Sequence, residues 1–477
     1  MNMTRALFEH IIQQYVLPLI PVANEGRIIS SDECSFANML SEKTVQIISE
    51  GDFTYICFSP RQIMPEFYYI SKLSCASDHL KTARSVLNQI LSSIGRAQIL
   101  DDDSRSIFYV DALCQTSVTI GLCSILAGSI KDSSLLTQVI YALEKWSQKT
   151  YEGRKVPFGI IIDFDNKEYD PDKRSYISFL DPKYSASFSD GVFSAIVLNA
   201  HGQIMQHVSL PTSSAKTSLK NGTVKKNHYS LVPERFENFS KQCYNLRIGV
   251  IALSSGDILT VKGCELLYAK REGRWLAYGY SAFFRPCMNY VMAFSNKRSQ
   301  RNNTFVERIS KSIYLSILDA SFAHTGACIS VVDFKQYDDG LKVMLHNCLI
   351  SEDIDKSDDF VRKVGQSKYD AMTAKHAIIR QLTHYKVSDV SQPSTHSFAQ
   401  LSQKLRVELL SMDGATVIDK RGIIRSVGAI LRISPGSEEG GRMAAARELS
   451  KYGIAFKVSE DGGITGVYKE KVVFKIG

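Results

Sequence analysis

Three short segments near the end of the chain carry side chains that could bind a nucleotide. The first segment is a Met-Asp-Gly-Ala turn that ends at Ala415 and precedes a predicted strand. Gly414 allows close approach of the backbone, and the Asp413 carboxylate can bind a cation or a ribose hydroxyl. This turn therefore predicts one wall of a binding site.

The other two segments add a phosphate-binding group and a second carboxylate. Gly440 and Gly441 precede a predicted alanine-rich helix with Arg442 in its first turn, and free N–H groups beside a guanidinium bind phosphate. Ser459 and Glu460 lie in a turn that follows a predicted buried strand. Each segment alone is typical of an ordinary loop. Their common position at the ends of strands in one predicted sheet indicates a nucleotide pocket.

The elements that position these segments form the last of three predicted regions. Residues 1–152 are helix-rich, since apolar residues recur at helical spacing over 80–91 and 135–146. Residues 153–303 contain short apolar runs bounded by turn residues, which predicts a β-rich middle domain. Residues 304–477 alternate predicted helices and strands, so the fold class expected there is α/β, a mixed sheet flanked by helices.

Two polar stretches interrupt this pattern. The basic stretch 216–226 predicts a surface loop, and the stretch 296–304 predicts a linker between domains. A nucleic-acid-binding arm would interleave aromatic residues with basic ones for stacking, and 296–304 contains no aromatic residue. Direct DNA binding is therefore not expected.

Composition excludes several classes of protein. The 477 residues are 44% apolar and 22% charged and carry a net charge of +8, which is typical of a globular chain that can bind an anion without requiring nucleic acid. The ten cysteines show no C-x-x-C spacing, which argues against zinc and disulfide frameworks and favours a reducing compartment. The apolar run 117–130 is too short to span a bilayer, and the first residues lack the pattern of a secretion signal. We expect a cytoplasmic protein without a membrane partner.

Two pairs of segments resemble each other within the chain. The segment 190–204 is similar to 413–424, and 249–258 is similar to 453–464. The first pair has an Asp-Gly turn, a buried strand, a polar turn with glycine and a returning strand, a combination that hairpin chemistry produces repeatedly. We therefore expect coincidence rather than duplication.

The order of the three segments resembles the diadenylate cyclase domain, the nucleotidyltransferase domain of the bacterial DNA-integrity scanning protein, which condenses two ATP molecules into cyclic di-AMP. The resemblance covers residues 304–477, where 323–332, Ala-His-Thr-Gly-Ala-Cys-Ile-Ser-Val-Val, is similar to the first core strand of that domain. The rest of the chain resembles the amino-terminal part of bacterial proteins with DACNV-type sensor domains, in which the cyclase-like fold senses nucleotides in defence systems. The resemblance implies that Asp413 and Glu460 occupy acidic metal-site positions, with Mg²⁺ or Mn²⁺ bound together with a nucleotide.

One departure from the family pattern bears on catalysis. Active cyclases carry Gly-Thr-Arg-His-Arg at the helix start, where this chain has Gly-Gly-Arg-Met-Ala from Gly440 to Ala444. Two of the three triphosphate-binding side chains are thus replaced, and each lost preorganised donor costs about 10²–10³-fold in rate. The resemblance therefore implies a catalytically degenerate nucleotide sensor. An active metal-dependent nucleotidyltransferase and an interaction scaffold with a vestigial pocket are the alternatives.

The expected partners follow from this resemblance. A sensor needs a nucleotide or dinucleotide ligand and a separate effector polypeptide, because no segment of the chain resembles an effector. Active cyclases pair two domains face to face, and a sensor that keeps this surface forms a homodimer. The alternative is that residues 190–275 cover the surface within one chain.

Overall fold

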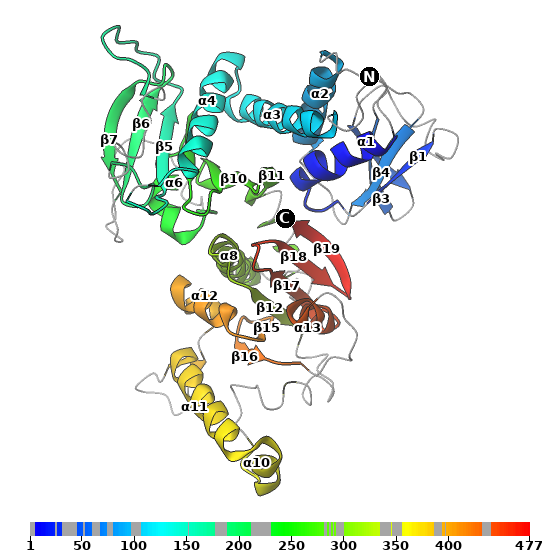
Figure 1. Cartoon of the computed structure of the whole chain (residues 1–477). Coiled ribbons are helices and arrows are strands. Elements are labelled where there is room, and N and C mark those ends of the chain that lie inside the picture. The colour runs from blue at the N-terminus through cyan, green and yellow to red at the C-terminus, as the bar shows by residue number, and fades with distance from the viewer. Residues whose placement is uncertain are drawn as a thin grey trace. The chain divides into compact units, whose positions relative to one another are not determined.

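The computed structural model describes residues 5–23, 26–30, 45–50, 53–59, 67–73, 80–96, 106–150, 152–176, 188–210, 230–280, 284–285, 288–289, 291, 300–333, 345, 355–385, 394–395, 397–431 and 440–477. The predicted basic loop 216–226 lies outside these residues. The chain divides into two compact units, Met1–Phe283 and Phe284–Gly477 (Figure 1).

The first unit begins with a short helix and a four-stranded antiparallel sheet. The helix α1 (Arg5–Ile11) continues into the short turns η1 (Ile12–Val16) and η2 (Leu17–Leu19). The strands pair in the order β1-β4-β3-β2. Their bounds are β1 (Arg27–Ser30), β2 (Val45–Glu50), β3 (Phe53–Phe58) and β4 (Phe67–Leu73). The region predicted as helix-rich therefore also contains a sheet. Its strands are rich in Ile, Tyr and Phe, which favour strands, but they are too short for periodicity to identify.

Three long helices follow this sheet, namely α2 (Leu80–Arg96), α3 (Ser106–Ala127) and α4 (Ile130–Ser147). The helices α2 and α4 confirm the helical predictions over 80–91 and 135–146. Within α3, Val110–Ala127 is long and apolar enough to cross a membrane, so the apolar run is longer than the sequence suggested. Of this segment, 56% is buried inside the folded chain.

A seven-stranded sheet forms the rest of the first unit. The order is β11-β10-β9-β8-β5-β6-β7, with β5 and β6 parallel and the other neighbours antiparallel. The strand bounds are β5 (Phe158–Asp163), β6 (Ser194–Asn199), β7 (Ile204–Ser209), β8 (Arg247–Ala252), β9 (Ile258–Lys262), β10 (Glu265–Arg271) and β11 (Arg274–Ala277). The turn η5 (Glu234–Phe236) and the helix α6 (Glu237–Ser240) precede β8. Trp146 of α4 packs on Phe158, with ring centroids 4.4 Å apart, so α4 covers this sheet.

The second unit is built on a six-stranded sheet with the order β16-β15-β12-β17-β18-β19, in which β12 and β15 are parallel and the other neighbours antiparallel. The strand bounds are β12 (Ala327–Val332), β15 (Ala415–Asp419), β16 (Ile424–Ala429), β17 (Gly453–Val458), β18 (Ile464–Tyr468) and β19 (Lys471–Ile476). The helices are α8 (Gln300–Phe322), α12 (Gln403–Ser411) and α13 (Gly441–Leu449). The helix α8 begins inside the stretch 296–304, so its last residues are helical rather than a linker.

These helices cover both faces of the six-stranded sheet. Successive side chains of a strand point to opposite faces. The Thr416 hydroxyl donates to the Leu409 carbonyl of α12, whereas Ala415 and Val417 join a core cluster with Met443 of α13. Because α8 packs against α12, these two helices lie on one face and α13 on the other. The prediction of a mixed sheet flanked by helices is confirmed.

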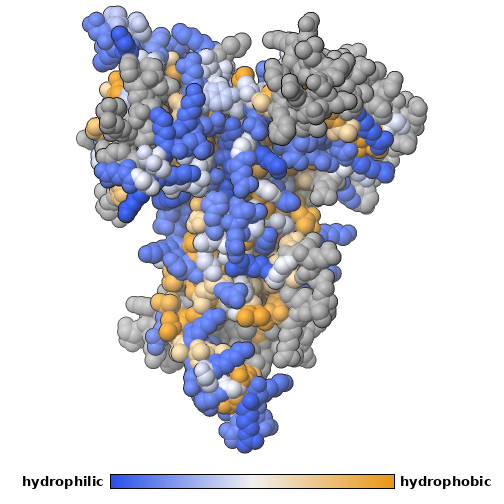
Figure 2. Space-filling view, viewed as in Figure 1, coloured by the Kyte–Doolittle hydropathy of each residue, from blue (hydrophilic) through white to orange (hydrophobic). Residues whose placement is uncertain are grey.

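A helical pair lies between β12 and α12 in the sequence. It consists of α10 (Asp358–Val364) and α11 (Gln366–Thr383), which are followed by the short strands β13 (His384–Tyr385) and β14 (Ser394–Thr395) and the turn η8 (Phe398–Gln400). Figure 2 shows hydrophilic surface at the α10 end of this pair. The exposed residues of α11 include Ile378 and Leu382 as well as several charged side chains.

The two large sheets share one strand topology. The strands β5, β6, β7, β8, β9 and β10 correspond in order and direction to β12, β15, β16, β17, β18 and β19. A register shift after Val197 in the β6–β7 pair also recurs after Val417 in the β15–β16 pair. A helix, α4 or α8, precedes the first strand of each set. We call residues 130–277 the first copy and residues 300–476 the second copy.

Two turns contain the same hydrogen bonds in both copies. At the end of β6 or β15, the side-chain oxygen of Asn199 or Asp419 accepts from the backbone N–H groups two and four residues later. At the end of β8 or β17, Leu253 or Ser459 donates its N–H to the carbonyl oxygen four residues later and accepts from the glycine three residues later. Hairpin chemistry alone does not produce this agreement over whole sheets.

The expectation of coincidence between the similar segments is therefore wrong. The segments 190–204 and 413–424 occupy corresponding strands and turns of the two copies. Gly191 lies eight residues before Asn199, whereas Gly414 lies five residues before the corresponding Asp419, so the first copy has three additional residues in this segment. These additional residues interrupt the sequence similarity, whereas the strand pairing is preserved.

Candidate functional site

The three segments predicted to bind a nucleotide meet at one edge of the six-stranded sheet. Strand β12 is parallel to β15 and antiparallel to β17, so the start of β12, the start of β15 and the end of β17 share that edge. Gly326 precedes β12, Asp413 and Gly414 precede β15, and Ser459 and Glu460 follow β17. The pairing of distant strands thus brings these residues to adjacent positions.

Arg442 connects the start of α13 to this edge. Its Nη1 donates to Glu460 Oε1 at 3.3 Å, and the two side chains are 30% and 79% exposed. A Cβ atom at position 326 would collide with the Arg442 guanidinium, so Gly326 leaves the space that this group occupies. Arg442 Nε is buried without a hydrogen-bond partner among the described residues. The unpaired Nε lies inside the fold, so a ligand would contact the exposed part of the guanidinium.

Two glycines stand at the start of α13. Gly440 has a φ of 79°, a left-handed conformation that favours glycine. Among the described residues, nothing lies within 4 Å of a Cβ atom placed at Gly440 or Gly441. The first N–H groups of a helix have no intrahelical acceptor. Together with Arg442, they form a positive surface suited to a phosphate.

The turn before β15 contributes an exposed carboxylate on a tightly held backbone. Asp413 is exposed, whereas Ala415 is buried in the core cluster. Gly414 has a φ of 98°, and a Cβ atom there would stand 2.6 Å from the Gly428 carbonyl carbon. The close approach predicted for Gly414 is thus an approach to the neighbouring strand β16.

We expect Gly414→Ala to lower the free energy of unfolding of the second unit by about 3 kcal/mol, because a positive φ and an overpacked contact each cost roughly 1–3 kcal/mol. Hydrogen exchange of the β15 amides in the full chain measures this change. Gly440→Ala is the control, since its φ is also positive but its surroundings are open. Equal effects of the two variants would contradict the importance of the contact with Gly428.

Ser459 is engaged within its own turn. Its hydroxyl donates to the Gly463 carbonyl at 3.1 Å, and its N–H donates to the same oxygen at 2.9 Å. Asp461 accepts from the Gly463 N–H at 3.0 Å. The Ser321 hydroxyl donates to the Gly462 carbonyl. Ser459 therefore holds the backbone that carries Glu460 at the sheet edge.

Met443 and Ala444, which differ from the diadenylate cyclase pattern that the sequence resembles, lie in the interior. Met443 and Ala444 are 8% and 6% exposed, and Met443 belongs to the core cluster. Burial raises the pKa of the nearby Cys328 thiol to about 12, although the Arg442 and Lys457 charges lower it. Because Met443 and Ala444 are buried and uncharged, Arg442 is the cation that this part of α13 offers to the site.

Asp413 and Glu460 are the two carboxylates that the resemblance places at a metal site. No group of three or more His, Cys, Asp or Glu side chains that could hold a metal occurs among the described residues. Asp413 and Glu460 follow the register of β15 and β17, two strand spacings or about 10 Å apart. Glu460 also pairs with Arg442. Glu460 is thus engaged by a guanidinium, whereas the Mg²⁺ or Mn²⁺ that the resemblance implies would need both carboxylates as ligands.

The corresponding edge of the first copy has a different chemistry. The strand pairing and turns align Leu253 with Ser459 and Ser254 with Glu460. The same difference in residue number between the two copies places Phe236, which is fully buried, at the position of Arg442. This offset holds in the core, where Phe239 and Cys243 lie against Gly249, just as Ala445 and Leu449 share a core cluster with Ala455.

The acidic turn of the first copy is also used differently. Asp190 Oδ1 accepts hydrogen bonds from the backbone N–H groups of Val192, Phe193 and Ser194. Its carboxylate thus stabilises the turn before β6, whereas the Asp413 carboxylate is exposed. The shared architecture does not require a charged cluster at this edge.

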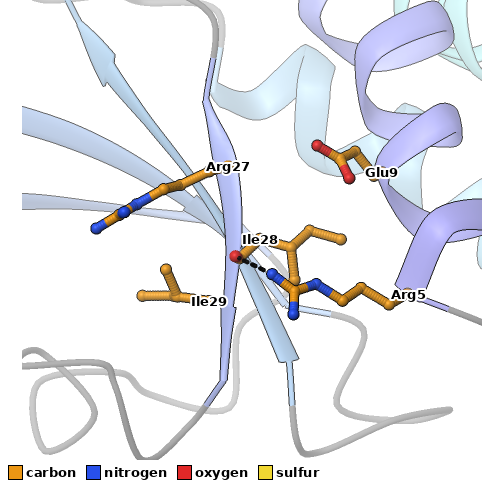
Figure 3. Close-up of a pocket in the computed structure, with 5 residues that line it drawn as sticks. All are labelled: Arg5, Glu9, Arg27, Ile28 and Ile29. Carbon is orange, nitrogen blue, oxygen red and sulfur yellow. Dashed lines mark hydrogen bonds between the residues drawn. The ribbon is translucent and has the colours of Figure 1, made fainter.

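A separate cavity of about 470 Å³ lies in the first unit. It is lined by Arg5, Glu9, Arg27, Ile28 and Ile29. Figure 3 shows that Arg27 points away from Arg5, whose Nη2 donates to the Ile28 carbonyl at 2.8 Å. The two guanidiniums therefore do not converge on one point.

No protein-family model matches the chain, and no curated protein matches it significantly.

Proposed function

We propose that the second copy is a nucleotide-binding sensor built on a catalytically degenerate diadenylate-cyclase-like fold. The observation that carries the proposal is the contrast between the two copies. The second has Arg442 and Glu460 where the first has Phe236 and Ser254. Since the same architecture folds with a buried phenylalanine at this position, the presence of Arg442 in the second copy supports a role for its charge in binding.

The site favours binding over catalysis. Transfer of a nucleotidyl group requires several preorganised donors around the developing charge. Here Arg442 supplies one cation, while Met443 and Ala444 are turned into the core. We infer that the protein acts in the cytoplasm of a bacterial defence or signalling system and passes the signal to a separate effector polypeptide.

Calorimetry with the full chain tests the proposal. We expect ATP, dATP or cyclic di-AMP to bind with micromolar or tighter affinity, and adenosine to bind much more weakly because it lacks phosphates. Adenosine is the matched control, since it keeps the base and the sugar. No binding of any of these nucleotides, together with an unchanged thermal unfolding temperature, would instead favour the scaffold alternative.

One observation keeps an enzymatic alternative in view. The Asp413 carboxylate is exposed at the same edge as the start of α13, where it could assist a nucleotidyl transfer. Incubation with labelled ATP and Mn²⁺, followed by chromatography, separates the two functions. A new product that is lost in Asp413→Asn would favour the nucleotidyltransferase over the sensor.

A further inference from the structure

The second copy contains a helical insertion at its candidate site. Strands β5 and β6 of the first copy are joined by residues 164–193, whose described part contains no α-helix. Strands β12 and β15 are joined by the longer stretch 333–414, which contains α10 and α11 in addition to α12. The insertion is therefore a further difference between the two copies, because it occurs in the copy that has the charged cluster.

A side chain of α11 reaches the turn that carries Asp413. Gly428 of β16 has a φ of 63°, and a Cβ atom there would stand 2.5 Å from Lys375 Nζ and 2.9 Å from the Asp413 carbonyl oxygen. The Lys375 ammonium therefore lies over the backbone of this turn, in space left by a glycine. Among the described residues, no carboxylate pairs with Lys375.

Lys375 and Arg442 occupy two separate positions along the sheet edge. Lys375 lies over β16 and Arg442 over the start of β12, two strand spacings or about 10 Å apart. One phosphate group cannot contact both cations across this separation, since a hydrogen bond spans about 3 Å. An anion with several phosphates can.

We propose that Lys375 is a second ligand-binding cation and that the site takes a ligand with two or more phosphates, such as a nucleoside triphosphate or a cyclic dinucleotide. This inference rests on the proposed function. It assigns the insertion a role in selecting the ligand by its phosphates, with α11 supplying the second charge and α13 the first.

Titration calorimetry of the full chain with ATP and with AMP tests the inference. We expect Lys375→Ala to weaken ATP binding about 10-fold, the lower end of the range for a charge-assisted hydrogen bond, and to change AMP binding less than twofold. Lys375→Arg should retain most of the affinity for ATP. Lys363→Ala, an exposed lysine of α10, is the control and should bind both nucleotides like the wild type.

Each of the remaining outcomes contradicts a stated part of the proposal. Wild-type affinity of Lys375→Ala for ATP, or an equal loss for ATP and AMP, would overturn the role of Lys375 in ligand selection and leave the proposed function standing. Absence of any nucleotide binding by the wild type would overturn both. Because Lys375 is exposed, an unchanged thermal unfolding temperature in Lys375→Ala excludes misfolding as the cause of a loss.

Discussion

Replacing Arg442 with alanine is expected to weaken nucleotide binding by roughly 10- to 150-fold, the range for loss of one charge-assisted hydrogen bond. The expectation follows from its position, with Nη1 on the exposed Glu460 and a buried Nε without a partner among the described residues. Calorimetry with ATP measures the change. Arg447→Ala on the same helix is the matched control, because Arg447 donates to the Glu470 carbonyl instead. Unchanged affinity in Arg442→Ala would contradict the assignment of the site.

The substitution Glu460→Gln tests the same site, because the direction of its effect on the affinity for ATP depends on the role of Glu460. If Glu460 only competes with phosphate for Arg442, its neutralisation should raise the affinity for ATP a few-fold. If Glu460 instead holds a divalent cation with the nucleotide, the substitution should lower the affinity when Mg²⁺ or Mn²⁺ is present. The geometry favours the first result, since Glu460 already pairs with Arg442 at 3.3 Å.

Asp419→Ala is expected to have the largest effect on stability. This carboxylate, at the end of β15, is 2% exposed and pairs with Arg425 at 2.7 Å and Arg421 at 3.2 Å. It also accepts the N–H groups of Arg421 and Ile423. Removing the carboxylate leaves these backbone N–H groups without their acceptor, which costs about 1–3 kcal/mol for each unsatisfied group, whereas the guanidiniums left behind are 68% and 22% exposed and remain solvated. Hydrogen exchange of the β15 and β16 amides in the full chain reports this loss.

The first copy supplies the control for this prediction. Asn199 occupies the position of Asp419 and makes the same two backbone hydrogen bonds without a charge. Asp419→Asn should therefore keep the turn and lose only the ion pairs, which gives a smaller destabilisation than Asp419→Ala. Equal losses in the two variants would mean that the guanidinium pairing, and not the turn, provides the stability.

The sequence alone determined the local elements and the residue types at the site. The helical spacing over 80–91 and 135–146 was sufficient because one apolar face repeats within a single element. Turn chemistry likewise located Asp413, Arg442 and Glu460, since glycine and acidic residues mark strand and helix ends. The short strands of the first sheet were not predicted, because a few apolar residues in a row do not distinguish strand from helix.

Only the tertiary structure decided which of these residues meet and which are unavailable. The pairing of β12 with β15 and β17 depends on contacts between distant segments, which local periodicity does not encode. The same pairing revealed the two copies, which three additional residues after Gly191 obscure in the sequence. Packing of α13 placed Met443 in the core. Packing also brought Lys375 of α11 to Gly428, although the sequence pattern of α11 does not mark Lys375 as a binding residue. Local sequence thus specifies the elements, whereas the composition of the site depends on register and packing between residues far apart in the chain.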